Sequence, residues 1–293
     1  MPTIAANDIE ICYESFGPED APPLLLVMGL GAQMTAWTPG LISELLDRGF
    51  RVIRFDNRDA GLSSKSEGDA PNVMALYAAS AAGEPVEAPY TLSLMAADAV
   101  ALLDALDIPA AHIAGASMGG MIVQMMAIEH PDRVISMTSI MSTTGAADVG
   151  QPDPEAMGAL LAPAPTTRTE AIEQNVAGGR IVGGSLFNEE LARAAAAEAY
   201  DRSFNPAGFA FQIAAIAATG DRTERLAEVD VPTLVIHGRE DSLISLSGGE
   251  ATAATIPGAD LLVLSRMGHD LPPFYWPQVA DAIFNIAARG EDR

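Results

Sequence analysis

The run Gly115-Ala116-Ser117-Met118-Gly119-Gly120 is the feature of the sequence whose residue types and spacing most directly suggest chemistry. It contains Gly-x-Ser-x-Gly, in which small residues two positions before and after a serine let a strand and a helix meet at a tight turn. Such a turn exposes the hydroxyl at a helix N-terminus, where partial positive charge favours a developing anion. We therefore predict that Ser117 is a nucleophile. Gly183-Gly184-Ser185 lacks the second flanking glycine.

A serine hydroxyl needs a general base at neutral pH, and the sequence has four histidines. His112 opens the apolar run that leads to Ser117, so the length of that run separates them by about 3.3 Å per residue. His130 lies at the far end of the helical run that follows the serine, and His237 belongs to a segment that leads into an acid. His269 lies in a loop after the last strand run and is the predicted base.

An imidazole that acts as a base needs a carboxylate to orient it and to stabilise its charged form. Asp241 follows the end of a strand run and is the predicted acid. The adjacent Glu240 points the other way in an extended segment, as a solvated acid would. The chain order Ser117, Asp241, His269 matches one of the known orders of a Ser-His-Asp triad.

Attack on a carbonyl also needs two donors for the oxyanion that forms. The backbone N–H of Met118, the residue after the serine, is the first predicted donor. The second is the N–H of Leu30 in a loop that contains two glycines, with Gly29 or Gly31 as rivals. A soft, apolar substrate pocket is predicted from methionines and tryptophans near these loops. The predicted pocket residues, for which ordinary packing is the alternative, are Met28, Met34, Trp37 and Trp276.

Short, mostly apolar runs alternate with helical segments, which predicts a parallel sheet with helices on both faces. Residues 8–16 alternate with a period of two, which is typical of an antiparallel strand with one wet face. The other strand runs are 23–28, 50–55, 112–115, 134–140, 233–236 and 261–264, and the helical runs are 41–48, 93–106, 118–129, 248–255 and 278–288.

Residues 144–221 break this alternation, because turn-rich sequence is followed there by Ala-rich helical segments. We predict a helical cap insertion at 144–221 that divides a core of residues 1–143 and 222–293. A continuation of the sheet is the alternative.

The chain carries 39 acidic residues against 16 Lys and Arg, a formal charge of −23. This charge opposes binding to nucleic acid or to an anionic membrane. Lys65 is the only lysine, so a Ser-Lys dyad is excluded unless Lys65 supplies it. Cys12 is the only cysteine, which excludes an intrachain disulfide and a cysteine zinc site. We expect a cytoplasmic protein without metal or cofactor; whether it forms a homodimer is left open.

The motifs together resemble the α/β-hydrolase superfamily, in the branch with a helical cap after the sixth strand, and within it the aclacinomycin methylesterase group. The resemblance rests on residues 26–31, 54–63, the Ser117 turn and Met267-Gly268-His269. It implies a mostly parallel eight-stranded α/β sheet with helices on both faces and an inserted cap. It also implies that Asn57-Arg58-Asp59 is a structural turn near the site. Many relatives have His-Gly where this chain has Met28-Gly29.

A serine nucleophile restricts which reactions of that superfamily this chain could catalyse. Epoxide hydrolases and haloalkane dehalogenases need a carboxylate at this position, so acyl chemistry remains. We expect a serine hydrolase that cleaves a carboxylic ester or lactone of small to medium apolar substrates through an acyl-enzyme. A cofactor-free perhydrolase or a C–C bond hydrolase would use the same residues. A small-ligand receptor with vestigial hydrolysis is the alternative of another class.

Overall fold

The computed structural model describes residues 1–291, apart from the side chains of residues 80 and 81. Within this part of the chain eight strands form one sheet in the order β1-β2-β4-β3-β5-β6-β7-β8. The first two strands are antiparallel to their neighbours, and the other six run parallel. The strands are β1 (Thr3–Ala6), β2 (Ile9–Phe16), β3 (Pro23–Val27), β4 (Arg51–Phe55), β5 (Ala111–Ala116), β6 (Val134–Ile140), β7 (Thr233–Gly238) and β8 (Asp260–Leu264).

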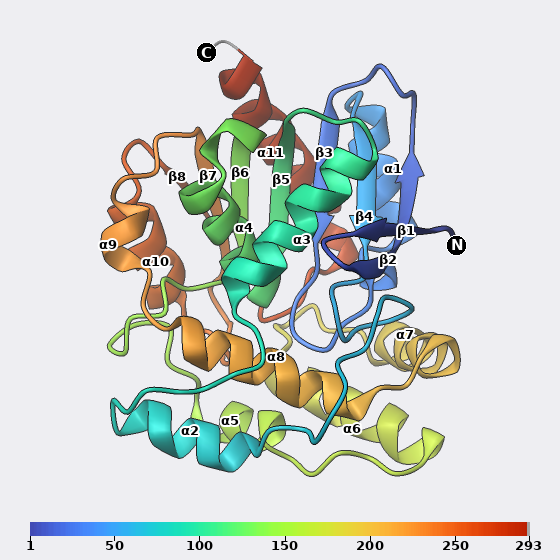
Figure 1. Cartoon of the computed structure of the whole chain (residues 1–293), viewed down its shortest axis with the longest axis vertical. Helices are drawn as coiled ribbons and strands as arrows, with labels where there is room; N and C mark the ends of the chain where they lie inside the picture. The colour runs from blue at the N-terminus through green and yellow to red at the C-terminus, as the bar shows by residue number, and fades with distance from the viewer. Residues whose placement is uncertain (292–293) are drawn as a thin grey trace.

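Helices cover both faces of this sheet, as the alternating pattern predicts (Figure 1). One face packs against α3 (Leu92–Ala105) and α4 (Met118–Glu129), and the other against α1 (Pro39–Asp47) and α11 (Trp276–Glu291). The α/β class and the mostly parallel eight-stranded sheet are therefore confirmed. The remaining helices of the core are α9 (Thr223–Leu226) and α10 (Leu246–Thr255), with short 3-10 turns at Met34–Ala36, Pro131–Arg133 and Pro273–Tyr275.

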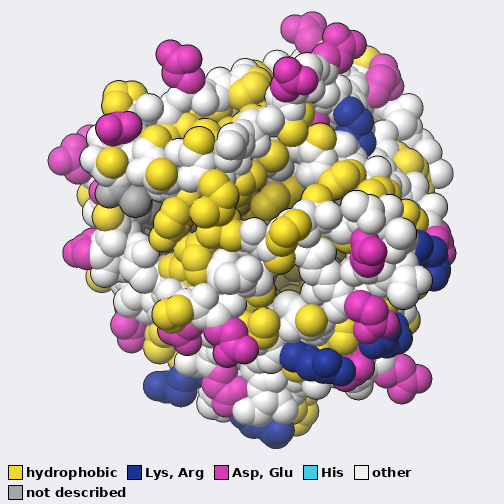
Figure 2. Space-filling model, turned by 90° about the horizontal axis from the view of Figure 1, so that it is seen from below, with side chains coloured by type: hydrophobic (Ala, Val, Ile, Leu, Met, Phe, Trp, Pro, Cys, Tyr) yellow, Lys and Arg dark blue, Asp and Glu magenta, His cyan; other side chains and the backbone are white. Residues whose placement is uncertain are grey.

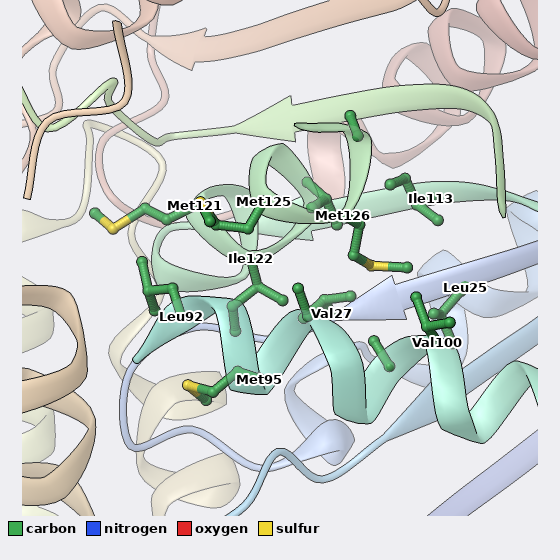
Figure 3. Packing of buried hydrophobic residues seen from close by; sticks show 14 of the residues in the cluster. Leu25, Val27, Leu92, Met95, Val100, Ile113, Met121, Ile122, Met125 and Met126 are labelled. Atoms are coloured by element: carbon green, nitrogen blue, oxygen red, sulfur yellow. The ribbon is translucent and has the colours of Figure 1, made fainter. Parts of the chain in front are cut away.

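The apolar strand runs exist because the central strands bury both of their faces. In β3, Leu25 and Val27 face one core cluster, and Leu24 and Leu26 face the other. Figure 3 shows the first cluster, in which methionines from α4 fill the space between the sheet and α3. Met121, Met125 and Met126 are buried there, which is the packing role expected of unbranched side chains in an irregular space.

Four helices lie between β6 and β7, within residues 144–221, which we call the cap segment. They are α5 (Pro154–Leu160), α6 (Arg168–Val182), α7 (Glu189–Arg202) and α8 (Pro206–Thr219). Together with α2 (Val73–Ala81), which contacts α8, they form a layer below the sheet in Figure 1. Figure 2 looks at this layer from outside and shows apolar side chains gathered in a band across it.

The elements that were not predicted from the sequence include α2 and β1, and each of these two has a physical reason. The helix α2 is apolar on all sides, with Met74 and Tyr77 exposed, so it shows no helical periodicity. The strand β1 has four residues and gains its register from pairing with β2, as in the pair Ile4 and Ile11. No helix in the described part of the chain combines the length and apolarity needed to cross a bilayer.

Candidate active site

Ser117 occupies a strained turn between β5 and α4. Its backbone has φ 56° and ψ −120°, a conformation that a non-glycine residue rarely adopts. A Cβ atom on Gly119 would lie 2.0 Å from the carbonyl oxygen of Val27, and one on Gly115 would lie 2.0 Å from that of Gly119. The flanking glycines are therefore required by the close approach of β3, β5 and α4, which holds the serine at the carboxyl edge of the sheet.

His269 lies between Ser117 and Asp241. Its Nε2 is 2.9 Å from the serine Oγ, and its Nδ1 is 2.8 Å from the Asp241 Oδ2. A carboxylate accepts hydrogen bonds, so Nδ1 carries the proton and Nε2 is free to accept the serine proton. The other carboxylate oxygen accepts the N–H groups of Leu243 and Ile244, at 2.9 Å each, which fixes the orientation of Asp241. The three predicted residues thus form one hydrogen-bonded chain.

The other three histidines lie apart from Ser117. His237 is fully buried and does not line the cavity described below. Its Nε2 donates to the carbonyl oxygen of Ile244 at 2.8 Å, so it supports the loop after β7, and burial lowers its pKa. His112 lies at the amino end of β5, and His130 caps the far end of α4.

A segment of residues 181–185 in the cap segment contacts the loops that carry the acid and the base. The exposed carboxylate of Glu240 accepts the N–H and the hydroxyl of Ser185. The carbonyl oxygen of Val182 accepts the N–H of His269 at 2.7 Å. A Cβ on Gly268 would lie 2.3 Å from the nitrogen of Gly184, so this contact is backbone against backbone. Glu240 therefore binds the cap segment, while its neighbour Asp241 binds the base.

The loop of residues 28–34 contains the predicted oxyanion donor Leu30, for which we call it the oxyanion loop, and it passes beside the serine. A Cβ on Gly29 would lie 3.1 Å from the Cβ of Ser117. The N–H of Gly31 donates to Gln212 Oε1 at 2.7 Å, so this rival donor already has a partner. Met118 is the first residue of α4, and the first N–H groups of a helix have no intrahelical acceptor.

The site opens into a cavity of about 320 Å³. Met28 and Trp37 line it, whereas Met34 and Trp276, which were predicted with them, do not. Met34 is fully buried in the core, and Trp276 packs against Gly40 and donates its indole N–H to the carbonyl oxygen of Leu271. The lining consists of Met28, Gly29, Leu30, Ala32, Ala36, Trp37, Ala116, Ser117, Met141, Leu160, Phe209, Leu243, His269, Asp270 and Leu271.

Asp270 is the acidic side chain of this lining, which contains no Lys or Arg. Its Oδ1 accepts the N–H of Gly268 at 3.1 Å, and burial raises the pKa of its carboxyl. Phe209 and Leu160 reach the cavity from α8 and α5. None of these three was predicted as a pocket residue from the sequence. For Phe209 and Leu160 the reason is that nothing in the local pattern of a helical segment shows which of its faces meets a site formed by distant loops.

The turn Asn57-Arg58-Asp59 lies behind the oxyanion loop and outside the cavity lining. Asn57 Nδ2 donates to the carbonyl oxygen of Met28 at 2.8 Å. Arg58 forms an ion pair of 2.6 Å with Asp98, a carboxylate that is almost fully buried. These contacts are structural: they attach the turn to the loop and to α3.

The sequence and the fold were compared with those of known proteins. Rhodomycin D methylesterase of Streptomyces peucetius is 29% identical over 97% of both chains. A 2-hydroxymuconate semialdehyde hydrolase of Pseudomonas sp. (strain CF600) is 30% identical over 89% of this chain and 82% of its own. The solved enol-lactonase from Burkholderia xenovorans LB400 shares the fold over 100% of both chains, with a TM-score of 0.72 and 24% identity.

The model of the α/β hydrolase fold matches residues 22–273, which include the serine turn, the acid and the base. The same span contains all six parallel strands and the cap segment. Sequence match, sheet order and the hydrogen-bonded Ser-His-Asp chain at the carboxyl edge agree with one another, and the protein belongs to the α/β-hydrolase fold family.

Proposed function

We propose that the protein is a serine hydrolase that cleaves carboxylic esters, with Ser117 as nucleophile, His269 as base and Asp241 as the orienting acid. The observation that carries this proposal is the pair of hydrogen bonds through His269, at 2.9 Å to the serine and 2.8 Å to the acid. Family membership and the likeness to a methylesterase support the same reaction class.

In the proposed reaction His269 Nε2 takes the Ser117 proton while Oγ attacks the ester carbonyl. The N–H groups of Met118 and Leu30 bind the oxyanion of the tetrahedral intermediate. Collapse of this intermediate leaves an acyl-enzyme, and His269 returns its proton to the departing alcohol. A water molecule, deprotonated by His269, then releases the acid and restores Ser117.

The cavity favours an uncharged substrate of small to medium size. Its volume of about 320 Å³ and its mostly apolar lining suit an apolar acyl or alcohol group. The lining contains no Lys or Arg to pair with a substrate carboxylate, and its one acidic side chain, Asp270, offers no counter-charge. We propose that the substrate is a neutral ester or lactone.

We also propose a division of the chain in which residues 1–143 and 222–293 form the core and the cap segment, residues 144–221, covers the site.

Hydrolysis of a C–C bond is the second candidate, because the same three residues can perform it. The likeness to a semialdehyde hydrolase keeps this candidate open. The lining argues against it for that relative's named substrate: a muconate is an anion, and a cavity with one carboxyl and no Lys or Arg offers it no counter-charge.

The proposal is tested by hydrolysis of p-nitrophenyl acetate and butyrate by the wild type and by Ser117→Ala, with a fluorophosphonate probe on both. We expect turnover and labelling of the wild type, and a loss of kcat of about 10⁴-fold or more in the variant. A wild type that is not labelled, or a variant that retains full activity, would contradict the nucleophile assignment.

The substrate class is tested by comparing p-nitrophenyl butyrate with p-nitrophenyl hemisuccinate, whose acyl chain ends in a carboxylate. We expect the neutral ester to have the higher kcat/KM by about 10-fold or more, because like charges repel in a poorly solvated cavity. Asp270→Asn should reduce this preference. A wild type that prefers the hemisuccinate, or turns over a diketone faster than both esters, would contradict the neutral-ester assignment.

A further inference from the structure

Side chains from other elements bind the backbone of the oxyanion loop at three of its residues, Met28, Gly31 and Met34. Asn57 Nδ2 donates to the carbonyl oxygen of Met28 at 2.8 Å. Asp56 Oδ1 accepts the N–H of Met34 at 2.8 Å. Both of these side chains come from the turn after β4, in the core. The third attachment, at Gly31, comes from helix α8 of the cap segment.

Gln212 makes this third attachment through an amide that is fully buried. Its Oε1 accepts the N–H of Gly31 at 2.7 Å, and its Nε2 donates to the carbonyl oxygen of Arg58 at 2.8 Å. An amide oxygen only accepts and an amide nitrogen only donates, so the two bonds fix the orientation of the side chain. Gln212 therefore links the oxyanion loop to the turn behind it.

The backbone of α8 is held close to the same turn, so the position of Gln212 is fixed as well. A Cβ on Gly208 would lie 2.1 Å from the carbonyl oxygen of Asp59. Asn205, at the start of the helix, donates to that same oxygen at 2.9 Å. Helix α8 can therefore shift little along the turn without breaking the contacts that place Gln212.

The N–H of Leu30 lies between two backbone groups that are held. The peptide unit before it is fixed by Asn57 at the Met28 carbonyl, and the unit after it by Gln212 at the Gly31 N–H. The carbonyl oxygen of Gly29 accepts the N–H of Ala32 at 3.3 Å. Because a trans peptide unit is planar, its N–H points opposite to its carbonyl. The direction of the Leu30 N–H is thus set by its neighbours on both sides.

We propose that Gln212 is a positioning residue through which the cap segment orients the Leu30 N–H as an oxyanion donor. This inference rests on the proposed function, because the oxyanion exists only if Ser117 attacks a carbonyl. It gives the cap segment a second role beside covering the cavity: a displacement of α8 lowers the rate of the chemical step, even where the cavity lining still binds the substrate.

The experiment compares Gln212→Met, which has nearly the same shape but no hydrogen-bonding group, and Gln212→Asn, which keeps the amide but is one methylene too short to span both partners. The matched control is Thr219→Val on the same helix, which removes the bonds of Thr219 Oγ1 to the carbonyl of Ala215 and the N–H of Leu92. Kinetics on p-nitrophenyl butyrate are measured with melting temperature and with binding of a butyl trifluoromethyl ketone and of the matching methyl ketone.

We expect both Gln212 variants to lose about 10- to 100-fold in kcat with KM changed by less than about 3-fold, since removal of one oxyanion donor costs about 10²- to 10³-fold. The trifluoromethyl ketone, which forms an oxyanion adduct, should bind more weakly by a similar factor, and the methyl ketone as in the wild type. Thr219→Val should keep kcat within about 2-fold whatever its melting temperature.

A folded Gln212→Met or Gln212→Asn with wild-type kcat, or one that loses no more than Thr219→Val, would overturn the inference and leave the proposed function intact. A loss that appears in KM and in methyl ketone binding would also overturn it, because the residue would then only shape the cavity. Absence of ester turnover in the wild type would overturn the proposed function and the inference together.

Discussion

Ser117 and the oxyanion loop lie side by side at the cavity, but contacts of different kinds hold them. The serine turn is fixed by backbone packed against backbone, where Gly115 and Gly119 bring β3, β5 and α4 together. The oxyanion loop is held by side chains, with Asp56 and Asn57 coming from the turn after β4 and Gln212 and Arg202 from the cap segment. The turn of Ser117, the proposed nucleophile, is therefore held by contacts within the core, and the loop beside it by the core and the cap segment together.

This difference shows that a local sequence motif does not by itself produce a complete site, because the loop beside the serine depends on contacts from distant parts of the chain. The strained backbone of Ser117 persists because the surrounding strands and helix over-determine it. The oxyanion loop makes a looser backbone contact at Gly29 and is held in addition by buried polar partners, which are effective when they are fully satisfied. Variants at Gly115 or Gly119 should therefore act through the position of Ser117 or through folding, and variants at Gln212 through the geometry of the loop.

Among the variants below, the largest effect on catalysis is expected at the proposed acid. Asp241→Asn should lower kcat by about 10⁴-fold, because the base loses the carboxylate that fixes its tautomer and stabilises its charged form. Glu240→Gln is the matched control, one position away, and should keep kcat near the wild-type value, since its carboxylate binds Ser185 instead. Equal losses of kcat in the two variants, measured on p-nitrophenyl butyrate, would contradict the assignment of Asp241 as the acid.

The backbone character of the serine turn is tested by Gly119→Ala. The new Cβ would lie 2.0 Å from the carbonyl oxygen of Val27, and we expect the free energy of unfolding to fall by more than about 4 kcal/mol. Gly178→Ala in α6 is the control, because no atom lies within 4 Å of its added Cβ. That variant should be stabilised by about 0.5 to 1 kcal/mol. Urea unfolding of both measures the difference; similar values would contradict the packing argument.

The attachment of the cap segment to the loop through Arg202 is tested by Arg202→Met. Arg202, at the end of α7, pairs with the fully buried Asp56 at 2.7 Å and donates to Gln33 Oε1 in the loop at 2.6 Å, and the Asp56 carboxylate also holds the N–H of Met34. Loss of the partner leaves a buried charge, so we expect about 3 kcal/mol lower stability and a lower kcat. In the control Arg168→Met, which removes an exposed pair with Asp201, the unfolding transition should stay unchanged.

The double variant Arg202→Met with Asp56→Asn refines that test, because it removes the buried charge along with its partner. We expect it to be more stable than Arg202→Met alone. If kcat stays low in the double variant while stability recovers, the effect on the chemistry comes from the position of the loop. If kcat of the single variant equals that of the wild type, the cap segment does not act through Arg202.

The smallest effect is expected at the opposite end of β5, where His112 contacts Ser136 and Glu291. Burial lowers the pKa of His112 from 6.5, partly offset by Glu291, so the unfolded chain binds a proton first as the pH falls. The contribution of neutral His112 to the free energy of unfolding is complete above pH 6.5 and decreases below it, by at most about 1.4 kcal/mol per pH unit. His112→Asn should reduce the pH dependence of the free energy of unfolding, measured by urea unfolding at pH 5 to 8, without changing kcat. An unchanged pH dependence would contradict the assignment of this effect to His112.

Much of the core could be predicted because its signals are local. The alternation of apolar runs and helical segments gave the parallel sheet, since a strand buried on both faces has to be apolar throughout. The same holds for the strained turn at Ser117, where Gly-x-Ser-x-Gly reflects contacts between adjacent elements. The order of Ser117, Asp241 and His269 predicted which residues meet, and the structure brings these three together.

The pocket could be predicted only in part. Met28 and Trp37 line the cavity, whereas Met34 and Trp276 are drawn into packing and hydrogen bonds with the core. Proximity in sequence to a site loop does not determine where a side chain points. The helix α2 was missed for a related reason, because an apolar segment without periodicity gains its place from the helix it packs against, α8.

The sequence by itself determined the parallel sheet, the serine turn and the residue types of the catalytic chain, because each depends on neighbours a few positions away or on an apolar pattern. Only the tertiary structure decided that Gln212, 181 positions beyond Gly31, holds the oxyanion loop, and that Glu240 binds the cap segment while Asp241 binds the base. A buried hydrogen bond needs partners within about 3 Å, and for residues so far apart in the chain that proximity exists only after the core and the cap segment have packed together.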